Sequence, residues 1–497
     1  HLFNWYDTRT LDPLTPRFVS TVDNGNLVAS LWTLLHGSLE QLERPLLDPS
    51  LAAGILDCAH ELTELRLLPR KSYAELEKGL SRPDWLAYAL SIPDRTFYDL
   101  RHAQRKHSVE AGWFIDEAVS RLNAIRKTVR TYMPWLLPEF DSLRQNATLK
   151  SLSKPTNPPL NVLPDFITQL DADLNSISEK PAETPAETKD ASIHQLLALL
   201  PEARRRSLSL IDEIREIAAD SNALANQMDF SFLVNERRKL LAVGFEVETN
   251  RVTSACYDLL ASEARIAAFV AIAKGEISQD LWFSLSRLHT LQQGRPILLS
   301  WSGTMFEYLM PAIWMRTQPD TLLARSQEAA VRVQRAYGAS KGTPWGISES
   351  ARAKKDNDGS YGYFAFGIPS LAISKPEGNA TVISPYSTFL ALQADTPAAV
   401  ENLRRMSRMG WLGQFGFYDS ADYISAPGTR RRKYELVRNW MAHHQGMSLL
   451  AVTNLLRDGI IQHWFHQDPR VQATELLLEE KPVAYIQPSE KYGAPAA

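Results

Sequence analysis

The stretch YDLLASEARIAAFVAIAKG, Tyr257–Gly275, is typical of the second half of this sequence. Its apolar residues recur at helical spacing, and Gly275 follows them as the residue type that most often ends a helix. The stretch MSLLAVTNLLRDG, which ends at Gly459, repeats this arrangement. Glycine- and aromatic-rich segments separate such helices, without the alternation of strands and helices of a nucleotide-binding sheet. The sequence therefore predicts a mainly α fold with long loops collected at one end.

Glycine is distributed unevenly along the chain. Five of the 23 glycines precede residue 240 and eighteen follow it. Because glycine is needed where φ is positive or where the backbone approaches a ligand closely, we expect most special loops in the second half. The first half is predicted to be successive helices: in SLSLIDEIREIAADS, residues 207–221, the apolar residues follow the i, i+3, i+4, i+7 spacing of one helix face.

Residues 172–190 are rich in Pro, Glu, Thr and Ser, which predicts a solvated linker or flexible surface excursion. We expect one domain over residues 1–497, with a helical insertion over residues 40–240 that contains this excursion. No internal repeat of fixed period is found.

Composition and charge limit the class of protein. The 497 residues are 44% hydrophobic and 22% charged, the balance of a globular protein. A net charge of -3 provides no basic field for nucleic acid or acidic membranes. Two cysteines, Cys58 and Cys256, form neither a disulfide framework nor a zinc motif. No apolar run is long enough to span a membrane, and no signal peptide opens the chain. Because the chain begins without methionine, a targeting segment upstream, and with it secretion, is compatible with the sequence.

Nucleotide and serine-hydrolase chemistry is not indicated, because the phosphate-binding glycine motifs and G-x-S-x-G are absent. The adjacent His443 and His444 of AHHQG point to different faces of a helix, which favours hydrogen-bonded histidines near a helix start over a metal site. Carboxylates beside aromatic residues remain. They are typical of sugar chemistry, in which one carboxyl group is the acid and another the base or nucleophile, and we expect no metal or cofactor.

The loop GQFGFYDSADY, Gly413–Tyr423, interrupts a chain that otherwise favours helix. It holds two glycines, four aromatic residues and two aspartates, so it either turns a corner or contacts a substrate. Asp419 in this loop and Glu349 in PWGISES have unusual neighbours for solvated charges. A functional role is favoured for both.

Other candidates have a structural alternative. Glu307 is somewhat more typical of a buried carboxylate bound to an arginine, and Glu435 of a first-turn charge that interacts with the helix dipole. Three tryptophans lie beside glycine or hydroxyl residues. One alternative is that all three are core residues, and the other, which we favour, is that at least one of them lines a sugar subsite. These tryptophans are Trp301, Trp345 and Trp411.

Several motifs together resemble the glycoamylase-like central domain of cyclic β-1,2-glucan synthases. In chain order they are NWYDTRTL, STVDNGNL, YDLLASEARIAAFVAIAKG, LLSWSGTMFEYLMP, PWGISES, YGYFAFGIPSL, SPYST and MAHHQGMSLLA. The resemblance runs from Asn4 to about residue 456, but residues 40–235 carry little of it. It implies an (α/α)6 toroid that cleaves a growing β-1,2-glucan and rejoins it into a ring, and it is shared with a clan of β-1,2-glucanases.

The resemblance implies roles for individual residues. Glu349 matches the acid/base of the family, and Asp422 matches a second retained aspartate. Asp419 stands in GFYDSADY where the family usually has glutamate, so its carboxylate withdraws by about 1.5 Å on an unchanged backbone. Because retaining enzymes hold their carboxyl groups about 5–5.5 Å apart and inverting enzymes about 6.5–9.5 Å, we hypothesise a shift toward inversion, with Asp419 or Asp422 as base. If the backbone shifts inward instead, retention is kept.

Further residues are expected to line the glucan groove, either from the family motifs or from their own setting. They are Asp7, Arg9, Asp23, Asn26, Trp301, Glu307, Trp345, Tyr361, Trp411, Tyr418, Glu435, His443, His444 and Gln445.

The leading hypothesis is a glycoside hydrolase or transglycosylase that cleaves, and in the synthase case cyclises, linear β-1,2-glucan. The alternatives are an inverting endo-β-1,2-glucanase and a non-enzymatic glucan-binding domain that gauges chain length for a polymerase. A synthase domain would belong to a bacterial protein at the cytoplasmic face of the inner membrane, linked to glycosyltransferase and phosphorylase-like domains. A glucanase would be periplasmic or secreted. We expect no nucleic-acid partner and no membrane insertion by this segment.

Overall fold

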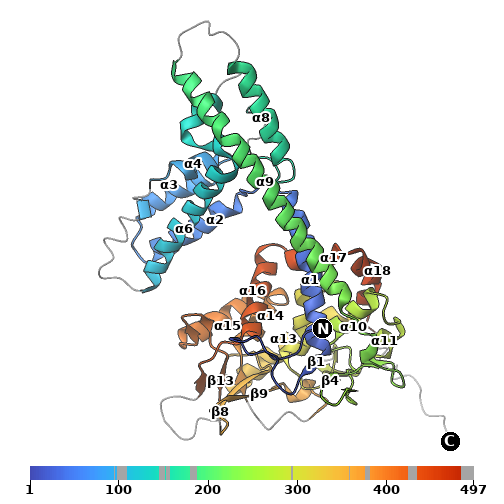
Figure 1. The fold of residues 1–497 in the computed structure, drawn as a ribbon. Helices are drawn as coiled ribbons and strands as arrows, with labels where there is room; N and C mark the ends of the chain where they lie inside the picture. The colour runs from blue at the N-terminus through green and yellow to red at the C-terminus, as the bar shows by residue number, and fades with distance from the viewer. Residues whose placement is uncertain are drawn as a thin grey trace, which may run out of the picture. The chain divides into compact units, whose positions relative to one another are not determined.

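The computed structural model describes residues 1–93, 96–97, 109–144, 152, 157–178, 187–292, 295–357, 359–374, 381–423 and 434–482. Helices predominate among these residues and the strands are short, so the predicted mainly α class is confirmed (Figure 1). Backbone contacts divide the chain into two units, residues 1–36 with 220–497 and residues 37–219. The closed (α/α)6 ring and the single-domain organisation stay predictions.

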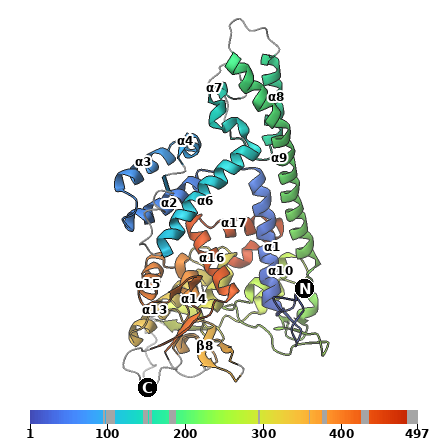
Figure 2. The same ribbon diagram turned by 60° about the vertical axis from the view of Figure 1, so that its left-hand side comes forward.

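The unit of residues 37–219 is helical and has its own core. Its helices are α2 (Ser50–Glu64), α3 (Arg70–Leu80), α4 (Trp85–Ser91), α6 (Val109–Tyr132), α7 (Asp141–Arg144), α8 (Leu163–Ser178) and most of α9 (Glu187–Gln227), with short 3-10 turns η1 (Pro134–Leu136) and η2 (Pro138–Phe140). Helix α2 lies alongside α6 (Figure 2), and Trp135 and Phe140 are fully buried between the helices of this unit. The predicted apolar face of residues 207–221 lies in α9, with Ile211 buried in this core.

The predicted insertion and excursion need correction at their ends. The insertion was expected to extend to residue 240, but residues 220–240 belong to the other unit. The expected excursion at 172–190 is helical wherever it is described, because α8 continues to Ser178 and α9 begins at Glu187. Fully buried Leu174 anchors the end of α8 in the core, which composition alone could not show. Residues 179–186 lie outside the described residues.

The other unit holds the remaining helices around one large core. They are α1 (Thr21–Leu42), which continues past residue 36, α10 (Arg265–Ala273), α11 (Asp280–Ser284), α12 (Met305–Leu309), α13 (Leu322–Lys341), α14 (Pro385–Leu390), α15 (Thr396–Arg408), α16 (Ala442–Leu456), α17 (Ile460–His466) and α18 (Pro469–Thr474). Short 3-10 turns are η3 (Ser231–Leu233), η4 (Met310–Ile313), η5 (Pro369–Leu371), η6 (Ala391–Gln393) and η7 (Glu475–Glu479). Phe269 of α10 packs against Trp282 and Phe465 at the centre of this core.

The helix predicted over residues 257–275 ends as expected but begins later. Gly275 has φ +74° and donates its N–H to Ile272, which ends α10. The helix begins only at Arg265, because the preceding residues pair with another segment: Ser286 donates to Asp258 and Leu260 donates to Ser286. The apolar run is thus divided between an irregular segment and a short helix whose residues are buried as far as Ala271.

The strands form small antiparallel sheets. Three of the described sheets lie outside the site: β4 (Gly244–Glu246) between β1 (Phe18–Ser20) and β5 (Arg251–Val252), β2 (Val234–Asn235) with β3 (Leu240–Leu241), and β6 (His289–Gln292) with β7 (Arg295–Leu298). The others carry the site: β8 (Ser350–Lys355) with β9 (Tyr361–Phe364), β11 (Leu412–Gly413) with β12 (Gly416–Phe417), and β13 (Ser420–Asp422) between β10 (Val382–Ile383) and β14 (Glu435–Val437). Figure 1 shows β8, β9 and β13 close together.

We expect alanine at Gly303 to destabilise the protein more than alanine at Gly342. Both glycines have left-handed φ, +72° and +67°, where an alanine costs roughly 1–2 kcal/mol. At Gly303 a Cβ would also lie 2.5 Å from the Ile368 carbonyl oxygen, whereas at Gly342 nothing lies within 4 Å. This overpacking should add about 1–3 kcal/mol. Thermal unfolding of the two variants measures the difference, and equal losses would contradict the predicted close packing at Gly303.

Candidate functional site

Glu349 lies in the short segment between α13 and β8, and both sides of this segment are held firmly. Ile347 exchanges two hydrogen bonds of 2.9 Å with the side chain of Gln334. The buried Ser348 hydroxyl lies 2.8 Å from that of Tyr386 and accepts the N–H of Phe306. Glu349 itself stays partly exposed between buried serines. These hydrogen bonds therefore fix the backbone beside Glu349, while its carboxyl group stays accessible.

The surroundings of Glu349 favour its protonated form. Its enclosure by protein raises its pKa to about 8, and the negative charges of Glu263, Glu307 and Asp23 add to this shift. At neutral pH a group of this kind carries a proton that it can donate, which is the state required of a general acid. The carboxyl group that the sequence analysis assigned to the acid role thus has the appropriate chemistry.

Glu263 was not identified from the sequence. It lies just before α10, partly exposed, 3.2 Å from the Ser262 hydroxyl, and burial followed by the charge of Glu307 raises its pKa to about 7. Its charge also acts on Glu349 and on Tyr257. The sequence did contain an indication of its role, because Glu263 and Arg265 are charged residues at the start of an otherwise apolar run.

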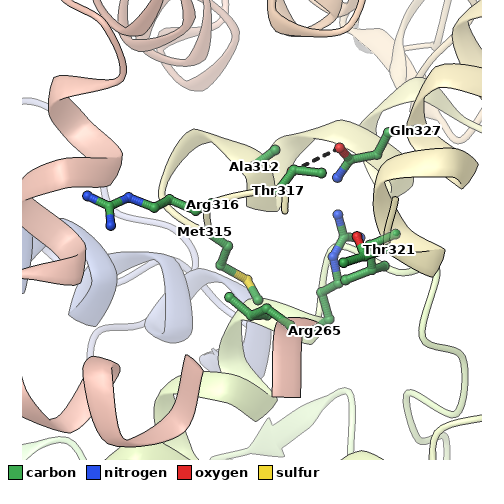
Figure 3. Close-up of a pocket in the computed structure, with 9 residues that line it drawn as sticks. Arg265, Ala312, Met315, Arg316, Thr317, Thr321 and Gln327 are labelled. Carbon is green, nitrogen blue, oxygen red and sulfur yellow. Dashed lines mark hydrogen bonds between the residues drawn. The ribbon is translucent and has the colours of Figure 1, made fainter. Parts of the chain in front are cut away.

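Arg265 holds the start of α10 against α12. Its guanidinium donates to the carbonyl oxygens of Ser262, Glu307 and Tyr308 at 2.6–2.9 Å, and the residue is 3% exposed. Figure 3 shows the adjacent cavity, where Thr317 and Gln327 are hydrogen-bonded to each other at 3.0 Å. The cavity measures about 10 Å³, which is room for one water molecule at most. Arg265 is therefore an anchor between helices.

The aspartates at 419 and 422 both bind the backbone of β8, the strand that follows Glu349. Asp419 accepts the N–H of Ala351 at 2.8 Å, and Asp422 accepts that of Ala353 at 3.1 Å. Asp422 also lies 3.9 Å from the Arg352 guanidinium. Both aspartate side chains are 0% exposed. Both carboxylates therefore lie inside the protein, and the role of Asp419 or Asp422 as base stays a prediction.

The second oxygen of Asp419 binds His444. The Nδ1 atom of His444 lies 2.7 Å from Asp419 Oδ1, and the imidazole ring stacks on Tyr386 with centroids 3.8 Å apart. Its Nε2 atom lies 3.3 Å from the hydroxyl of Tyr363, a residue that the sequence analysis did not single out. Tyr363 acts on Glu349 in the direction that lowers its pKa, against the larger effect of burial. Asp419, His444 and Tyr363 thus form one series of hydrogen-bonded side chains.

His443 and His444 lie at the start of α16, and the expected hydrogen-bonded histidine is His444. His443 is exposed, and desolvation by the neighbouring protein lowers the pKa of its ring to about 4, with a smaller contribution from His444. His443 is therefore neutral at pH 7. Within the described residues, no group of three His, Cys, Asp or Glu side chains is arranged to hold a metal ion.

A cavity of about 210 Å³ lies beside Asp419 and His444. Tyr418 and Gln445, both expected at the groove, line it, and Gln445 donates to the Phe417 carbonyl at 3.1 Å. Gly416, with φ +104°, is required there because a Cβ would lie 2.7 Å from the Gln445 side-chain oxygen. The remaining lining residues are Ser384, Tyr386, Phe389, Leu412, Phe417 and Ser448. The loop at residues 413–423 thus runs from the end of β11 through β12 and β13, turns a corner and forms part of a cavity wall.

The three tryptophans have different environments. Trp345 and Trp411 are 8% and 0% exposed and belong to the hydrophobic core, so their expected stacking on sugar is wrong. Trp301 is 41% exposed, and its indole donates to Asp258 at 2.9 Å, which holds the ring at the surface. Only Trp301 of the three is available for stacking.

Glu307 has the structural role that the sequence analysis favoured, with different partners. It is the N3 residue of a capping box with Thr304 at the start of α12. Its carboxylate also accepts from Ser300 Oγ at 2.9 Å and from the Ser302 N–H at 3.0 Å. The expected arginine is replaced by these hydroxyl and backbone donors, since Arg265 binds the Glu307 carbonyl oxygen instead.

Three other residues that were expected to line the groove lie at the surface. Asp7 accepts the N–H groups of Arg9 and Thr10 in a surface turn, and the Arg9 side chain is 89% exposed. Glu435 is exposed in β14 opposite Asp422, so the expected helix start there is wrong.

Helix α1 and strand β9 carry the rest of the expected groove residues. Asp23 and Asn26 lie one turn apart in α1, and the charge of Asp23 acts on Glu349. Tyr361 lies in β9 under the Lys355 ammonium, which is 4.7 Å from its ring centroid. Of these residues, Asp23 is the one that the electrostatics connect to Glu349.

Comparison with known proteins finds one family model and a curated relative. Residues 256–469 match the family model described as "Glycoamylase: Putative glucoamylase". The predicted resemblance is confirmed. The chain is 33% identical over 491 residues to "Cyclic beta-(1,2)-glucan synthase NdvB" of Rhizobium meliloti (strain 1021), covering 97% of this chain and 15% of that protein. The chain therefore spans less than a sixth of this bacterial relative.

Two solved structures are similar at low identity. One is the β-1,2-glucanase from Parabacteroides distasonis, with TM-score 0.44, 12% identity, and coverage of 75% of this chain and 52% of that chain. The other is the endo-β-1,2-glucanase from Talaromyces funiculosus in complex with sophorose, with TM-score 0.41, 13% identity, and coverage of 79% and 78%.

We expect Trp345→Ala to destabilise the protein by about 3–5 kcal/mol, because it removes a core indole. Trp301→Ala should cost only about 1 kcal/mol, mainly for its hydrogen bond to Asp258. Denaturant unfolding of both variants measures this contrast. A larger loss for Trp301→Ala would show that the surface indole, and not the core one, supports the fold.

The raised pKa of Glu349 also predicts a pH-dependent stability. Between its ordinary value of 4.5 and about 8, the folded protein keeps a proton that the unfolded chain has lost, so this contribution to stability falls as pH rises through that window. Glu349→Gln abolishes the effect. We expect the melting temperature of the wild type to fall more between pH 5 and 8.5 than that of Glu349→Gln, with exposed Glu401→Gln behaving like the wild type. Parallel curves for all three would refute the shift.

Proposed function

We propose that this chain is a glycoside hydrolase or transglycosylase that acts on β-1,2-glucan, with Glu349 as the general acid. The observation that carries the proposal is the environment of Glu349: a firmly held, partly exposed carboxyl group that is kept protonated by its enclosure in the protein and, to a smaller extent, by three neighbouring carboxylates. The relationship of nearly the whole chain to part of a cyclic β-(1,2)-glucan synthase, and of residues 256–469 to the glycoamylase family model, supports the substrate class.

In this proposal the Glu349 carboxyl group donates its proton to the glycosidic oxygen as the bond to the anomeric carbon breaks. The leaving sugar takes the proton as a new hydroxyl group. The carboxylate that remains is disfavoured by the charges of Glu263 and Asp23, so Glu349 readily regains a proton. Trp301 and Tyr363, 41% and 42% exposed, offer aromatic surface to the sugar rings.

The burial of Asp419 favours one alternative, an inverting endo-β-1,2-glucanase. Both Asp419 oxygens are occupied, by Ala351 and by His444, and the side chain is 0% exposed. A carboxylate held in this way does not reach an anomeric carbon as a nucleophile. Water then attacks the anomeric carbon without a covalent intermediate, keeps one proton as the new anomeric hydroxyl group and releases the other to solvent, which gives the inverted anomer. Ring closure that preserves the β linkage requires retention, so inversion points to hydrolysis.

Incubation with linear β-1,2-glucan separates these activities. Cyclic products establish transglycosylation, linear products that grow shorter establish hydrolysis, and binding without turnover establishes a glucan-binding domain. Proton NMR of the first-formed anomer then decides the stereochemistry: an α-anomer supports inversion and a β-anomer refutes it.

Glu349→Gln should reduce turnover of β-1,2-glucan by about 10²–10⁴-fold, while glucan binding stays largely intact, because the amide keeps the shape of the side chain and loses the acidic proton. Initial rates and isothermal titration calorimetry measure the two effects. Glu401→Gln, an exposed carboxyl group on α15 paired with Arg408, is the matched control and should keep the full rate. A near-normal rate for Glu349→Gln would remove Glu349 from the acid role.

We also propose that the chain works within a longer bacterial protein, linked to glycosyltransferase and phosphorylase-like domains at the cytoplasmic face of the inner membrane. The small share of the synthase relative that the chain covers supports this arrangement. None of the described helices combines the length and apolar composition of a membrane span. Mass spectrometry of the natural protein from membranes tests the proposal, and a free species of about 56 kDa would contradict it.

A further inference from the structure

The turn of the β11–β12 hairpin carries an exposed aromatic ring. The two strands end at the pair Gly413 and Gly416, so Gln414 and Phe415 form the turn between them. Phe415 is 67% exposed, although turns of this kind favour small polar residues. A large apolar side chain in this place adds little buried surface to the fold and leaves an aromatic face open to a ligand.

Trp440 fixes this ring in place. The rings of Phe415 and Trp440 meet edge to face, with centroids 5.3 Å apart. The Trp440 indole donates to the Gly416 carbonyl oxygen at 3.2 Å, and its ring lies 5.1 Å from that of Tyr418. The Arg438 guanidinium lies over Tyr418, 5.8 Å from the ring centroid. Because these contacts order the rings in the free protein, stacking a ligand on them costs little conformational entropy.

The same hairpin forms one side of the 210 Å³ cavity beside Asp419 and His444, and Leu412 at its edge is 50% exposed, so the cavity reaches the surface. Among the described residues, none binds the Tyr418 hydroxyl or the side-chain oxygen of Gln445, and both of these residues line the cavity. The Asp419 carboxylate is already occupied by its two hydrogen bonds. The cavity therefore offers aromatic walls and uncharged hydrogen-bonding groups, which fit a neutral polyhydroxyl ligand such as a pyranose ring.

Two contacts connect the cavity to the surroundings of Glu349. Tyr386 lines the cavity, and its hydroxyl lies 2.8 Å from that of Ser348, the residue before Glu349. The ring of His443, at the start of α16, lies 6.1 Å from that of Tyr363, which is 42% exposed. The charge of Glu349 acts on Tyr363 in turn. A glucan chain that meets Glu349 can therefore continue along the start of α16 to the hairpin.

We propose that this cavity and the Phe415 ring form a glucan-binding subsite at a distance from the bond that is cleaved. The cavity takes one glucosyl unit, and Phe415 stacks on a neighbouring one. The inference rests on the proposed function and names where the rest of the β-1,2-glucan chain lies. Because the subsite touches no reacting atom, it binds the ground state and the transition state equally, which lowers KM and leaves kcat unchanged. Only a chain long enough to reach from Glu349 to the hairpin gains from it.

Isothermal titration calorimetry with long linear β-1,2-glucan tests the subsite in the Glu349→Gln background, so that turnover does not consume the ligand. Phe415→Ala should weaken binding by about 3- to 10-fold, because the stacked ring is lost. Phe415→Tyr keeps the aromatic face and should bind as the parent does. Phe283→Ala is the matched control, since Phe283 in α11 is 64% exposed and does not line the cavity, and it should leave the affinity unchanged.

Tyr418→Phe tests the cavity by itself. It removes one hydroxyl group that no described residue binds, so the fold loses no hydrogen bond. A glucosyl unit in the cavity loses a hydrogen bond to this group, and the affinity for long glucan should fall by about 3- to 10-fold. Unchanged affinity in either Phe415→Ala or Tyr418→Phe would overturn the proposal.

Kinetics with Glu349 intact separate this inference from the proposed function. Phe415→Ala should lower kcat/KM for long chains by the factor that calorimetry records, through KM alone, and leave the shortest cleaved oligosaccharide unaffected. An equal loss for that oligosaccharide would overturn the subsite, because damage to the fold then explains the effect. A wild-type protein that binds glucan without turnover would refute the proposed function, while calorimetry still decides the subsite. A protein that binds no glucan would refute both.

Discussion

The buried Asp419 carboxylate accepts one hydrogen bond from the backbone of β8 and another from His444, and the first of them supports the strand beside Glu349. That strand begins one residue after Glu349. The second bond holds an imidazole whose other nitrogen lies 3.3 Å from the Tyr363 hydroxyl. One side chain therefore joins the strand next to the candidate acid to helix α16. A buried carboxylate is costly unless it is hydrogen-bonded, and each oxygen of Asp419 accepts one hydrogen bond, so that Asp419 connects three segments of the chain.

The acid is surrounded by groups that would not lie together in a structure selected for stability alone. Glu263, Glu307 and Asp23 all disfavour the ionised form of Glu349. Glu307 is held by a complete set of hydroxyl and backbone donors, so its proximity is a fixed part of the site. Glu263 is held less tightly, by Ser262 alone among the hydrogen bonds described. A protonated carboxyl group near neutral pH is thus obtained through burial and like charge, at a cost in stability above that pH.

The second half of the chain supplies nearly all of this arrangement. Glycines with positive φ, such as Gly346 and Gly416, allow the backbone to approach Ser387 and Gln445 more closely than a side chain would permit. The loops at 346–353 and 413–423 can therefore pack on each other and on α16. The buried tryptophans Trp345 and Trp411 belong to the hydrophobic core and connect these loops to it.

The sequence by itself determined the elements and the chemistry of single residues. Helical periodicity and Gly275 predicted a helix end correctly, the AHHQG motif predicted a hydrogen-bonded histidine near a helix start, and the setting of Glu349 predicted a carboxyl group of unusual character. These features depend on neighbours within a few residues, which a sequence displays directly.

Only the tertiary structure decided which side chains face one another. Glu263 and Tyr363 escaped notice because their partners are remote in sequence, and Trp345 and Trp411 were misjudged because burial depends on contacts between distant segments. Asp419 is the clearest case: its partners Ala351 and His444 lie 68 and 25 residues away, so no local pattern could show that its carboxylate points into the protein. The direction of a hydrogen bond and the pKa of a carboxyl group are set by such non-local neighbours, through geometry and burial that arise only when the chain is folded.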